Sequence, residues 1–331
     1  MQKFGVGVVG LGYSGTQHLN AYLKNKKVVV KGIYDINKNI IKSFSNLHNN
    51  GLKFISFEEM LKQKDIDIIS ICTPDHLHAD QAIQALKAGK NVLCEKPMAT
   101  TFEDCKKIIK AVRDTGKKFL TGQILRFSPY FIALKKLYDE GELGEAFFTE
   151  SDYLHDLRSL ASEWRTGKNK KWNPILGGGC HPIDLLRWVV GDIVEIYAVA
   201  NKAVANANYL YDNIVLSLKF KNGCIGKAMI SIGCTRPYAL NFSIYGTKGT
   251  LINNKIFLEK ILKMQDFMTI PLKTVEEFPY YNDEIEHLID CLENNKKPLV
   301  DEIEGAKTVA VCLAGISSVK KNEPIKIDYN F

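Results

Sequence analysis

The sequence predicts an α/β protein in which an N-terminal doubly wound parallel sheet precedes a second α/β domain with mostly antiparallel strands. Two observations predict this order. Over roughly the first 120 residues, short apolar runs alternate with amphipathic stretches, as parallel strands alternate with helices. Beyond residue 123, apolar and polar residues alternate one by one, as in half-buried antiparallel strands. We therefore predict two domains, residues 1–122 and 123–331.

The first domain contains the elements of a parallel sheet. Two amphipathic stretches predict helices over residues 79–88 and 101–115. Gly89 and Gly116 follow these stretches, and glycine readily takes the left-handed conformation that ends a helix. Buried strands are predicted at five apolar runs, which are residues 6–9, 28–33, 66–72, 91–94 and 119–121.

The second domain begins with a predicted helix over residues 128–140 and a strand over 146–151. Residues 216–220 show the clearest antiparallel pattern, because Ser217 and Lys219 alternate with apolar residues. A helix is predicted near the C-terminus from four apolar residues on one face, which are Ile285, Leu288, Ile289 and Leu292.

Composition excludes several classes of protein. Apolar residues make up 46% of the chain and charged residues 24%, which is ordinary for a globular protein. No apolar run approaches the ~18–20 residues of a membrane span, and the net charge of +7 is scattered. We therefore expect neither a membrane nor nucleic acid as a partner. The eight cysteines form no CxxC pair, which favours free thiols in a reducing cytoplasm and gives no support for a metal site.

A glycine-rich turn follows the first predicted strand. Gly10, Gly12 and Gly15 form the pattern GxGxxG, with Tyr13 and Ser14 inside it, and a predicted helix follows. The first glycine allows a tight turn, the second lets backbone approach a pyrophosphate, and the third lets the helix pack on the strand. The helix start then offers N–H groups and a positive dipole to the phosphates. The sequence therefore predicts a dinucleotide site.

The expected dinucleotide is NAD. Asp35 ends the second predicted strand, about 20 residues after the glycine turn, where an acidic residue holds the ribose hydroxyls. Its carboxylate would repel a 2′-phosphate, and no Arg follows it, so NADP is the less favoured alternative.

Two further segments follow predicted strands at the same edge of the sheet. Thr73-Pro74 is expected to line the nicotinamide-ribose crevice, and His78 is a further candidate for cofactor contact. In Glu95-Lys96-Pro97, the lysine can act as an acid or base, and the bond before Pro97 is a candidate for the cis form. The alternative for His78 is a histidine that only packs in the protein, and the alternative for Glu95 and Lys96 is an exposed ion pair.

His181 is a second candidate for acid–base chemistry. It follows three glycines, residues 177–179, which favour close approach of backbone to a ligand. Asp184 lies three residues later, so on a helix the two side chains would share a face and Asp184 could fix the imidazole tautomer. The alternative is a helix cap with a packed histidine.

Side chains suited to a polyol gather in the segment before these glycines. Tyr153 and Asp156 follow a predicted strand, and Trp164 and Arg165 lie in the next loop. Polyols bind through donors, acceptors and an apolar ring face, which this mixture supplies, although a surface loop is the alternative. The loop also raises the hypothesis of an anionic substrate through Lys168, Lys170 and Lys171.

These residues together resemble the Gfo/Idh/MocA family, which takes its name from glucose–fructose oxidoreductase, inositol dehydrogenase and a rhizopine catabolism protein. The resemblance covers nearly the whole chain, and the combination of the glycine turn with Glu95-Lys96-Pro97 is its specific part. It implies an N-terminal Rossmann domain, a C-terminal α/β domain with a large, open, mostly antiparallel sheet, and a homodimer or homotetramer. The segments that carry it are 10–15, 73–74, 95–97, Arg126, 141–144, 181–184, 283–285 and 298–300.

The resemblance also implies an activity. Family members typically oxidise a secondary hydroxyl of a sugar, cyclitol or derivative by hydride transfer to a nicotinamide. Lys96 matches the family's catalytic lysine and is also expected to contact cofactor and substrate. His181 matches the catalytic histidine that takes or gives the hydroxyl proton. We expect the substrate to contact Lys96, Arg126, Tyr153, Asp156, Trp164, Arg165, His181 and Asp184, and the cofactor to contact Glu95.

One position departs from the family pattern. Many members carry an Asp four residues before the histidine, where this chain has Gly177. Either Asp156 or Asp184 takes over its role, or the substrate and mechanism differ. Two other function classes remain open, which are glycoside cleavage through transient oxidation by bound NAD and a non-catalytic dinucleotide sensor.

Overall fold

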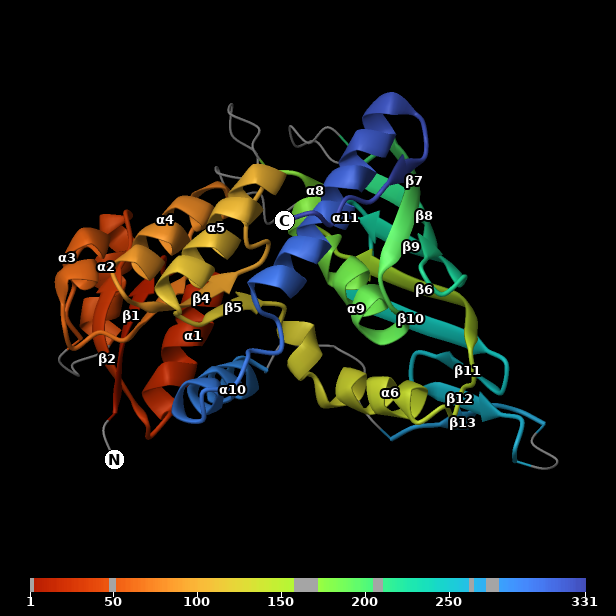
Figure 1. Ribbon diagram of the computed structural model, residues 1–331, viewed down its shortest axis with the longest axis horizontal. Helices are drawn as coiled ribbons and strands as arrows, with labels where there is room; N and C mark the ends of the chain where they lie inside the picture. The colour runs from red at the N-terminus through yellow and green to blue at the C-terminus, as the bar shows by residue number, and fades with distance from the viewer. Residues whose placement is uncertain (1–2, 48–51, 158–171, 205–210, 262–264, 272–279) are drawn as a thin grey trace. The chain divides into compact units, whose positions relative to one another are not determined.

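A computed structural model describes residues 3–47, 52–157, 172–204, 211–261, 265–271 and 280–331. It divides into a first unit (residues 1–124, 279–306 and 331) and a second unit (residues 125–278 and 307–330). The sequence suggested a division near 122 and a continuous second domain. The chain instead returns to the first unit after residue 278, because helix α10 (Tyr281–Glu293) packs against α1 (Tyr13–Lys24) (Figure 1).

The first unit contains the predicted parallel sheet. Its strand order is β2-β1-β3-β4-β5, and every pair of neighbours is parallel. The carboxyl ends of all five strands therefore lie at one edge, which is where doubly wound sheets bind ligands. The strands are β1 (Phe4–Val9), β2 (Val28–Tyr34), β3 (Ile68–Ile71), β4 (Asn91–Glu95) and β5 (Phe119–Gly122).

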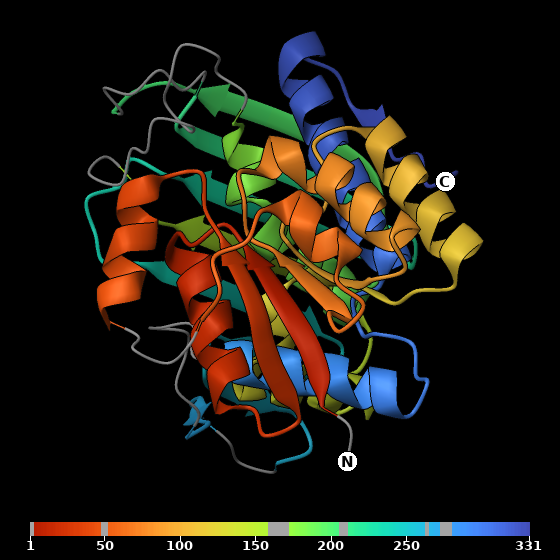
Figure 2. The ribbon, with the colours of Figure 1, turned by 90° about the vertical axis from the view of Figure 1, so that its left-hand side faces the viewer.

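Helices cover both faces of this sheet. Helix α1 connects β1 to β2, on one side of the sheet's centre, and α4 (Asp75–Lys87) connects β3 to β4, on the other side. Because such crossovers are right-handed, the two helices lie on opposite faces of the sheet. Figures 1 and 2 show α4 and α5 on one side of the strands and α1 on the other. The further helices of this unit are α2 (Lys38–Leu47), α3 (Phe57–Lys62) and α5 (Phe102–Thr115).

Local sequence explains how the predicted helices begin and end. Helix α5 begins where the Thr101 side chain accepts a hydrogen bond from the Asp104 N–H, and it ends at Gly116 with φ 65°. Helix α4 begins at Asp75, four residues before the predicted start, because Pro74 supplies a fixed φ at the position before it.

The second unit contains one nine-stranded sheet of order β13-β12-β11-β10-β6-β9-β8-β7-β14. Only β6 and β9 pair in parallel among these described strands, so the predicted large and mostly antiparallel sheet is confirmed. The strands are β6 (Ala146–Leu154), β7 (Ile193–Asn201), β8 (Asn213–Phe220), β9 (Ile225–Ser231), β10 (Ala239–Gly246), β11 (Gly249–Ile252), β12 (Lys255–Leu258), β13 (Met268–Thr269) and β14 (Ile325–Lys326).

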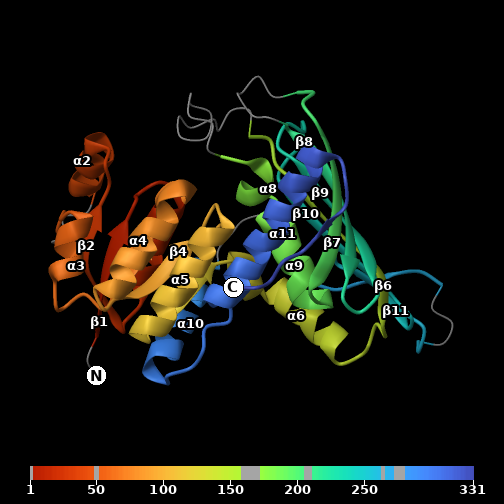
Figure 3. The same cartoon turned by 45° about the horizontal axis from the view of Figure 1, so that its top comes forward.

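Helices lie along one face of this sheet, as Figure 3 shows for α9 (Cys180–Val190) and α11 (Glu302–Lys321). In β8, Ile214 and Leu216 are buried, whereas Val215 and Ser217 are exposed on the other face, as the alternating sequence predicts. The remaining helical segments around the second unit are the 3-10 helix η1 (Ile124–Phe127), α6 (Pro129–Asp139) and α8 (Pro174–Gly177).

Two further sequence expectations concern the chain as a whole. Within the described ranges, no helix combines the length and the apolar character needed to cross a bilayer. All eight cysteines are free thiols, as predicted, and most of them are buried.

Candidate functional site

The glycine turn has the shape that a dinucleotide requires. Gly10 has φ +85°, and a Cβ there would lie 2.6 Å from the Cys72 carbonyl oxygen. A Cβ at Gly15 would overlap the Gly10 carbonyl oxygen, whereas a Cβ at Gly12 would meet nothing within 4 Å. The first and third glycines therefore allow packing, and the second faces open space at the start of α1, where no side chain caps the helix.

Asp35 lies beside this turn. One carboxylate oxygen accepts a hydrogen bond from the Leu11 N–H at 2.7 Å, and the other accepts one from the Asn37 N–H at 2.7 Å. Tyr13 is exposed and Ser14 is partly exposed in the same turn. The acidic residue and the glycine turn thus meet at the sheet edge, as the dinucleotide prediction requires.

The next two strands bring the other first-unit candidates to the same edge. Thr73-Pro74 follows β3. The segment Glu95-Lys96-Pro97, here called the Lys96 turn, begins at the last residue of β4, and β4 is the neighbour of β3. The Lys96–Pro97 peptide bond is cis, as predicted. His78 is 1% exposed, and its ring nitrogens lie 2.7 Å from the Pro97 and Thr73 carbonyl oxygens. Its contacts are therefore with backbone and join the two segments.

The sequence analysis missed a buried polar group below the Lys96 turn. His18 is fully buried in α1, and its Nδ1 lies 2.8 Å from the Ser70 Oγ. Its Nε2 lies 3.2 Å from Glu95 Oε1 and 4.0 Å from Glu284 Oε2. We call these four residues the His18 cluster. A histidine on the apolar face of an amphipathic helix was the signal in the sequence that could have revealed it.

At neutral pH the His18 cluster contains one cationic group, His18, and one anionic group, Glu95. Burial lowers the pKa of His18, but its contacts with Cys72 and Glu95 outweigh burial and leave this pKa raised. Burial raises the pKa of the Cys72 thiol, so Glu95 is the anionic neighbour at neutral pH. Burial also raises the pKa of Glu95, but the hydrogen bond and charge of His18 outweigh it and leave this pKa lowered. The pair is therefore an imidazolium with a carboxylate.

The pKa of Glu284 is shifted in the opposite direction to that of Glu95. Its side chain is fully buried, and burial together with the charge of Glu95 raises its pKa well above the usual range. The folded protein therefore keeps this carboxyl protonated at neutral pH, whereas the unfolded chain releases the proton. Its contribution to the free energy of unfolding is complete below the unfolded pKa of 4.5 and is lost as pH rises toward the folded pKa.

We expect Glu284→Gln to stabilise the protein increasingly as pH rises. The gain over the wild type should grow as pH rises above the unfolded pKa of 4.5, by no more than about 1.4 kcal/mol per pH unit, because the variant has no proton to take up on folding. Urea unfolding at several pH values measures it. A gain that does not change with pH would show that Glu284 is ionised in the folded state.

In the second unit, Arg126 and Asp184 bind each other. The Arg126 Nε and Nη2 each donate to one Asp184 oxygen at 2.8 Å, and Thr308 Oγ1 also donates to this carboxylate at 2.8 Å. Arg126 is 2% exposed and Asp184 1%. The carboxylate of Asp184 thus serves Arg126 and Thr308 and does not orient the ring of His181, contrary to the prediction.

His181 lies in an aromatic cluster instead. Its ring stacks on Tyr153 with centroids 5.9 Å apart and an interplanar angle of 21°. The Tyr153 hydroxyl lies 2.9 Å from His155 Nδ1, and Tyr238 packs edge-on against both Tyr153 and His155. His181 is 5% exposed in this setting. His155 and Tyr238 therefore pack around Tyr153, the residue whose ring stacks on the candidate catalytic histidine.

The three glycines before His181 have a different role from the predicted one. A Cβ at Gly177 would overlap the indole of Trp172, and a Cβ at Gly178 would lie 2.7 Å from the Tyr153 ring. A Cβ at Gly179 would lie 2.6 Å from the Ile175 carbonyl oxygen. These glycines allow close packing within the protein, contrary to the expectation that they approach a ligand. The Trp172 indole occupies the space that a side chain at residue 177 would enter.

We expect Gly177→Ala to destabilise the protein by about 1–3 kcal/mol, because the added methyl group meets the Trp172 indole. Helix propensity alone predicts that the alanine stabilises the protein, since Gly177 is the last residue of α8. Urea unfolding of G177A, W172A and the double variant measures the effect. The alanine should lose its cost in the W172A background, and an equal cost in both backgrounds would contradict this packing account.

Some candidates stand apart from these groups. Asp156 is half-buried after β6. Trp164, Arg165, Lys168, Lys170 and Lys171 lie outside the described residues. Asp75, which the sequence analysis did not select, is 3% exposed at the start of α4, and burial raises the pKa of its carboxyl.

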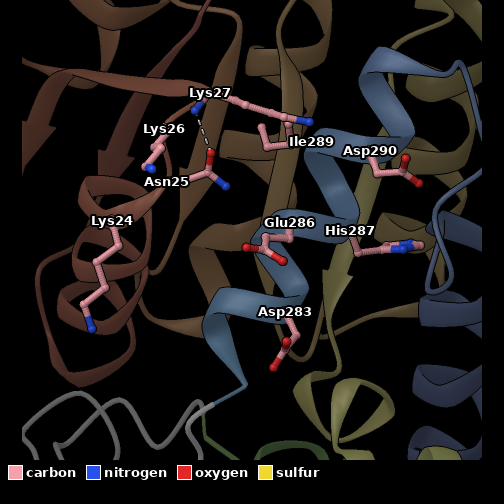
Figure 4. Close-up of a pocket in the computed structure, with 9 residues that line it drawn as sticks. All are labelled: Lys24, Asn25, Lys26, Lys27, Asp283, Glu286, His287, Ile289 and Asp290. Atoms are coloured by element: carbon pink, nitrogen blue, oxygen red, sulfur yellow. Dashed lines mark hydrogen bonds between the residues drawn. The ribbon is translucent and has the colours of Figure 1, made fainter.

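A pocket in the first unit lies away from this edge. Figure 4 shows residues 24–27 facing α10 across it. These residues precede β2, so the pocket lies at the amino edge of the sheet, opposite the glycine turn. The pocket is lined by three lysines and by three acidic residues, Asp283, Glu286 and Asp290. Because its charges are mixed, the pocket favours neither anions nor cations.

The fold and the glycine turn define a dinucleotide-binding protein of the Rossmann type. The family described as "Oxidoreductase family, NAD-binding Rossmann fold" (GFO_IDH_MocA) matches residues 4–123, and the "GFO/IDH/MocA C-terminal domain" matches residues 131–252. The chain therefore belongs to the Gfo/Idh/MocA oxidoreductase family, as its sequence motifs suggested.

Several characterised relatives resemble the chain. Levoglucosan dehydrogenase of Pseudarthrobacter phenanthrenivorans is 26% identical over 77% of this chain and 74% of its own length. The scyllo-inositol 2-dehydrogenase (NAD(+)) of Bacillus subtilis is 24% identical over 82% of this chain and 80% of its own length. Levoglucosan dehydrogenase solved with NADH and levoglucosan has a TM-score of 0.89 at 22% identity, covering 98% of this chain and 100% of that one. This structural likeness supports the fold.

Proposed function

We propose that this protein is an NAD-dependent dehydrogenase that oxidises a secondary hydroxyl of a sugar, cyclitol or sugar derivative. One observation carries the proposal. The glycine turn, Asp35, Thr73-Pro74 and the Lys96 turn all follow neighbouring strands at the carboxyl edge of one parallel sheet. This edge combines a dinucleotide cradle with an ammonium group, and the family relationship supports the same chemistry.

The residues of this chain divide the work. Bound NAD supplies the hydride acceptor. Gly10, Gly12, Tyr13, Ser14 and Gly15 hold its pyrophosphate. Lys96 and His181 hold the substrate hydroxyl, and as oxidation proceeds its proton passes to a neutral lysine amine or a neutral imidazole.

The remaining candidates act around the reacting groups. Asp35 holds the adenosine ribose, and Thr73-Pro74 borders the nicotinamide ribose, with His78 and Glu95 placing the neighbouring backbone. On the substrate side, we propose contacts from Tyr153, Asp156, Trp164 and Arg165, with Arg126 and Asp184 supporting them through their buried pair.

A screen of NAD+ reduction tests this function. The panel contains neutral sugars, inositols, levoglucosan, sugar acids and nucleotide sugars, with Lys96→Met protein as the blank. NADH formation from a carbohydrate-like alcohol is expected. Release of an aglycone without NADH accumulation would instead indicate redox-assisted glycoside cleavage, and NADH binding without turnover on any substrate would indicate a sensor.

We expect the wild-type protein to prefer NAD+ to NADP+ by at least tenfold in kcat/KM, because the Asp35 carboxylate would repel a 2′-phosphate. Asp35→Asn should narrow this preference by roughly tenfold, since a charged hydrogen-bond acceptor is worth about 1.5–3 kcal/mol. The asparagine keeps an oxygen for the Leu11 N–H of the glycine turn and loses only the acceptor for the Asn37 N–H. Steady-state kinetics with both cofactors decides this, and a wild-type preference for NADP+ would refute the role of Asp35.

We also propose a homodimer or homotetramer in a reducing cytoplasm. Apolar side chains stand exposed on strands of the second-unit sheet, including Phe147, Val199, Val215 and Ile225, which supports an interface between copies. The eight free cysteines support the reducing compartment. Light scattering on the purified protein tests the oligomeric state.

A further inference from the structure

The backbone of the Lys96 turn is held on both sides by buried histidines. His18 comes from α1 and contacts Glu95, the residue before Lys96. His78 comes from α4 and contacts the carbonyl oxygen of Pro97, the residue after Lys96. The two histidines are 0% and 1% exposed. Two helices that pack on opposite faces of the sheet thus each send an imidazole to the same three residues.

The contact from α1 reaches Lys96 through Glu95. His18 Nε2 lies 3.2 Å from Glu95 Oε1, and Glu95 Oε2 accepts a hydrogen bond from the Lys96 N–H at 3.2 Å. Ser70 in β3 holds the other ring nitrogen of His18 at 2.8 Å. The imidazole is therefore fixed at both nitrogens, and one of them orients the carboxylate that holds the Lys96 backbone.

The contact from α4 joins two loops. His78 Nδ1 lies 2.7 Å from the Pro97 carbonyl oxygen, and its Nε2 lies 2.7 Å from the Thr73 carbonyl oxygen. Carbonyl oxygens only accept hydrogen bonds, so the ring donates in each contact, and both bonds form together only in the imidazolium form, which has two N–H groups. One nitrogen of His78 thus holds the Lys96 turn, and the other holds the segment that borders the nicotinamide ribose in the proposed function.

Both histidines have charged or titratable neighbours. Around His18 these are Glu95, Glu284 and Cys72. Around His78 they are Asp75 from its own helix and Glu95 from β4. Burying the two imidazole rings is unfavourable unless their hydrogen bonds to Glu95, Ser70, Pro97 and Thr73 are made. This arrangement therefore favours a single geometry of the turn.

We propose that His18 and His78 are positioning residues that together fix the backbone on either side of Lys96 and so place its ammonium group. The inference rests on the proposed function, in which Lys96 acts on the substrate hydroxyl. A lysine side chain has four rotatable bonds, so its backbone must be fixed if the ammonium is to be held in place. A misplacement of about 1 Å lowers the rate of a positioned reaction by up to about 100-fold.

Asparagine and glutamine separate the two contacts of each ring. An asparagine amide nitrogen lies close to the position of the histidine Nδ1, and a glutamine amide nitrogen lies close to that of Nε2. His18→Gln therefore keeps the donor to Glu95, whereas His18→Asn keeps only the contact with Ser70. At position 78 the order reverses, because His78→Asn keeps the donor to Pro97 and His78→Gln keeps the donor to Thr73.

We expect the more harmful substitution to be asparagine at position 18 but glutamine at position 78, which we call the crossed pattern. H18N and H78Q should lose roughly 10- to 100-fold in kcat for the alcohol that the NAD+ screen identifies, and H18Q and H78N should lose less. H78N should raise the KM for NAD+ more than H78Q does, since it releases the Thr73 carbonyl. A role in packing alone predicts no such reversal, because glutamine is the larger residue at both positions.

The cofactor-free protein gives a second measurement. Lysines are labelled by reductive ¹³C-methylation, and the Lys96 signal is assigned by its loss in Lys96→Met protein. In a pH titration, the midpoint and chemical shift of this signal should change in H18N and H78Q but stay near the wild-type values in H18Q and H78N. Thermal unfolding of all four variants identifies any that fail to fold. In that event Ser70→Ala, which frees one nitrogen of His18, should move the Lys96 signal in the direction of H18N.

The outcomes separate the inference from the proposed function. If the Asn and Gln variants at each position give the same Lys96 signal and the same kcat, the positioning role is overturned. If K96M retains full turnover while the crossed pattern persists in the Lys96 signal, the histidines position the turn but the proposed role of Lys96 is wrong.

Discussion

Lys96→Met is expected to lower NAD+ reduction by about 10²- to 10⁴-fold, which is the range for losing a positioned acid–base group. The side chain length is nearly kept and the ammonium is removed, so the change is confined to the acid–base group of the Lys96 turn. Glu95 is held by His18 and by the Lys96 N–H. Stopped-flow and steady-state measurements of NADH formation with the substrate from the screen give the magnitude.

The matched control for this variant is Lys87→Met. Lys87 is exposed in the last turn of α4, so its replacement removes the same charge far from the sheet edge that carries the motifs. Turnover of K87M should stay within about twofold of the wild type, as is usual for a surface change. Fluorescence titration with NADH shows whether K96M still binds cofactor. Wild-type turnover by K96M would exclude Lys96 from the chemistry.

Asp184→Asn is expected to lower the free energy of unfolding by about 3–5 kcal/mol. The variant leaves the Arg126 guanidinium without its carboxylate in a site where the arginine is 2% exposed. Removing one partner of a buried ion pair is strongly destabilising, because the other charge loses its main compensation. Arg126→Met/Asp184→Asn should be less destabilised than the sum of the two single variants, because neither charge then remains. Urea unfolding of the three proteins measures the coupling.

An exposed pair in the same unit is the control. Lys135 and Asp139 pair across one turn of α6 at 2.6 Å, and the Asp139 side chain is 54% exposed. Lys135→Met should change the free energy of unfolding by no more than about 0.5 kcal/mol. If D184N were as mild as K135M, the Arg126–Asp184 pair would have to be solvated in solution.

The pair also shows why the sequence could not assign these two residues. Arg126 and Asp184 are 58 positions apart, and each alone has the chemistry of a substrate ligand. Their mutual contact depends on how α9 packs in the second unit. The same reason applies to Trp172, whose indole fills the space at Gly177. The family resemblance marked Gly177 as a departure, but no neighbouring residue in the sequence indicated that the Trp172 indole fills the space beside it.

Local patterns determined the elements and the family of this protein. The spacing of apolar residues, the glycine turn and the Lys-Pro segment depend on neighbours within a few positions, and the parallel sheet, α5 and β8 follow them directly. Only the tertiary structure decided that residues 279–306 join the first unit and that His18 meets Glu95. Such pairs form where strand order and helix packing bring distant side chains together, and no short stretch of sequence records that path.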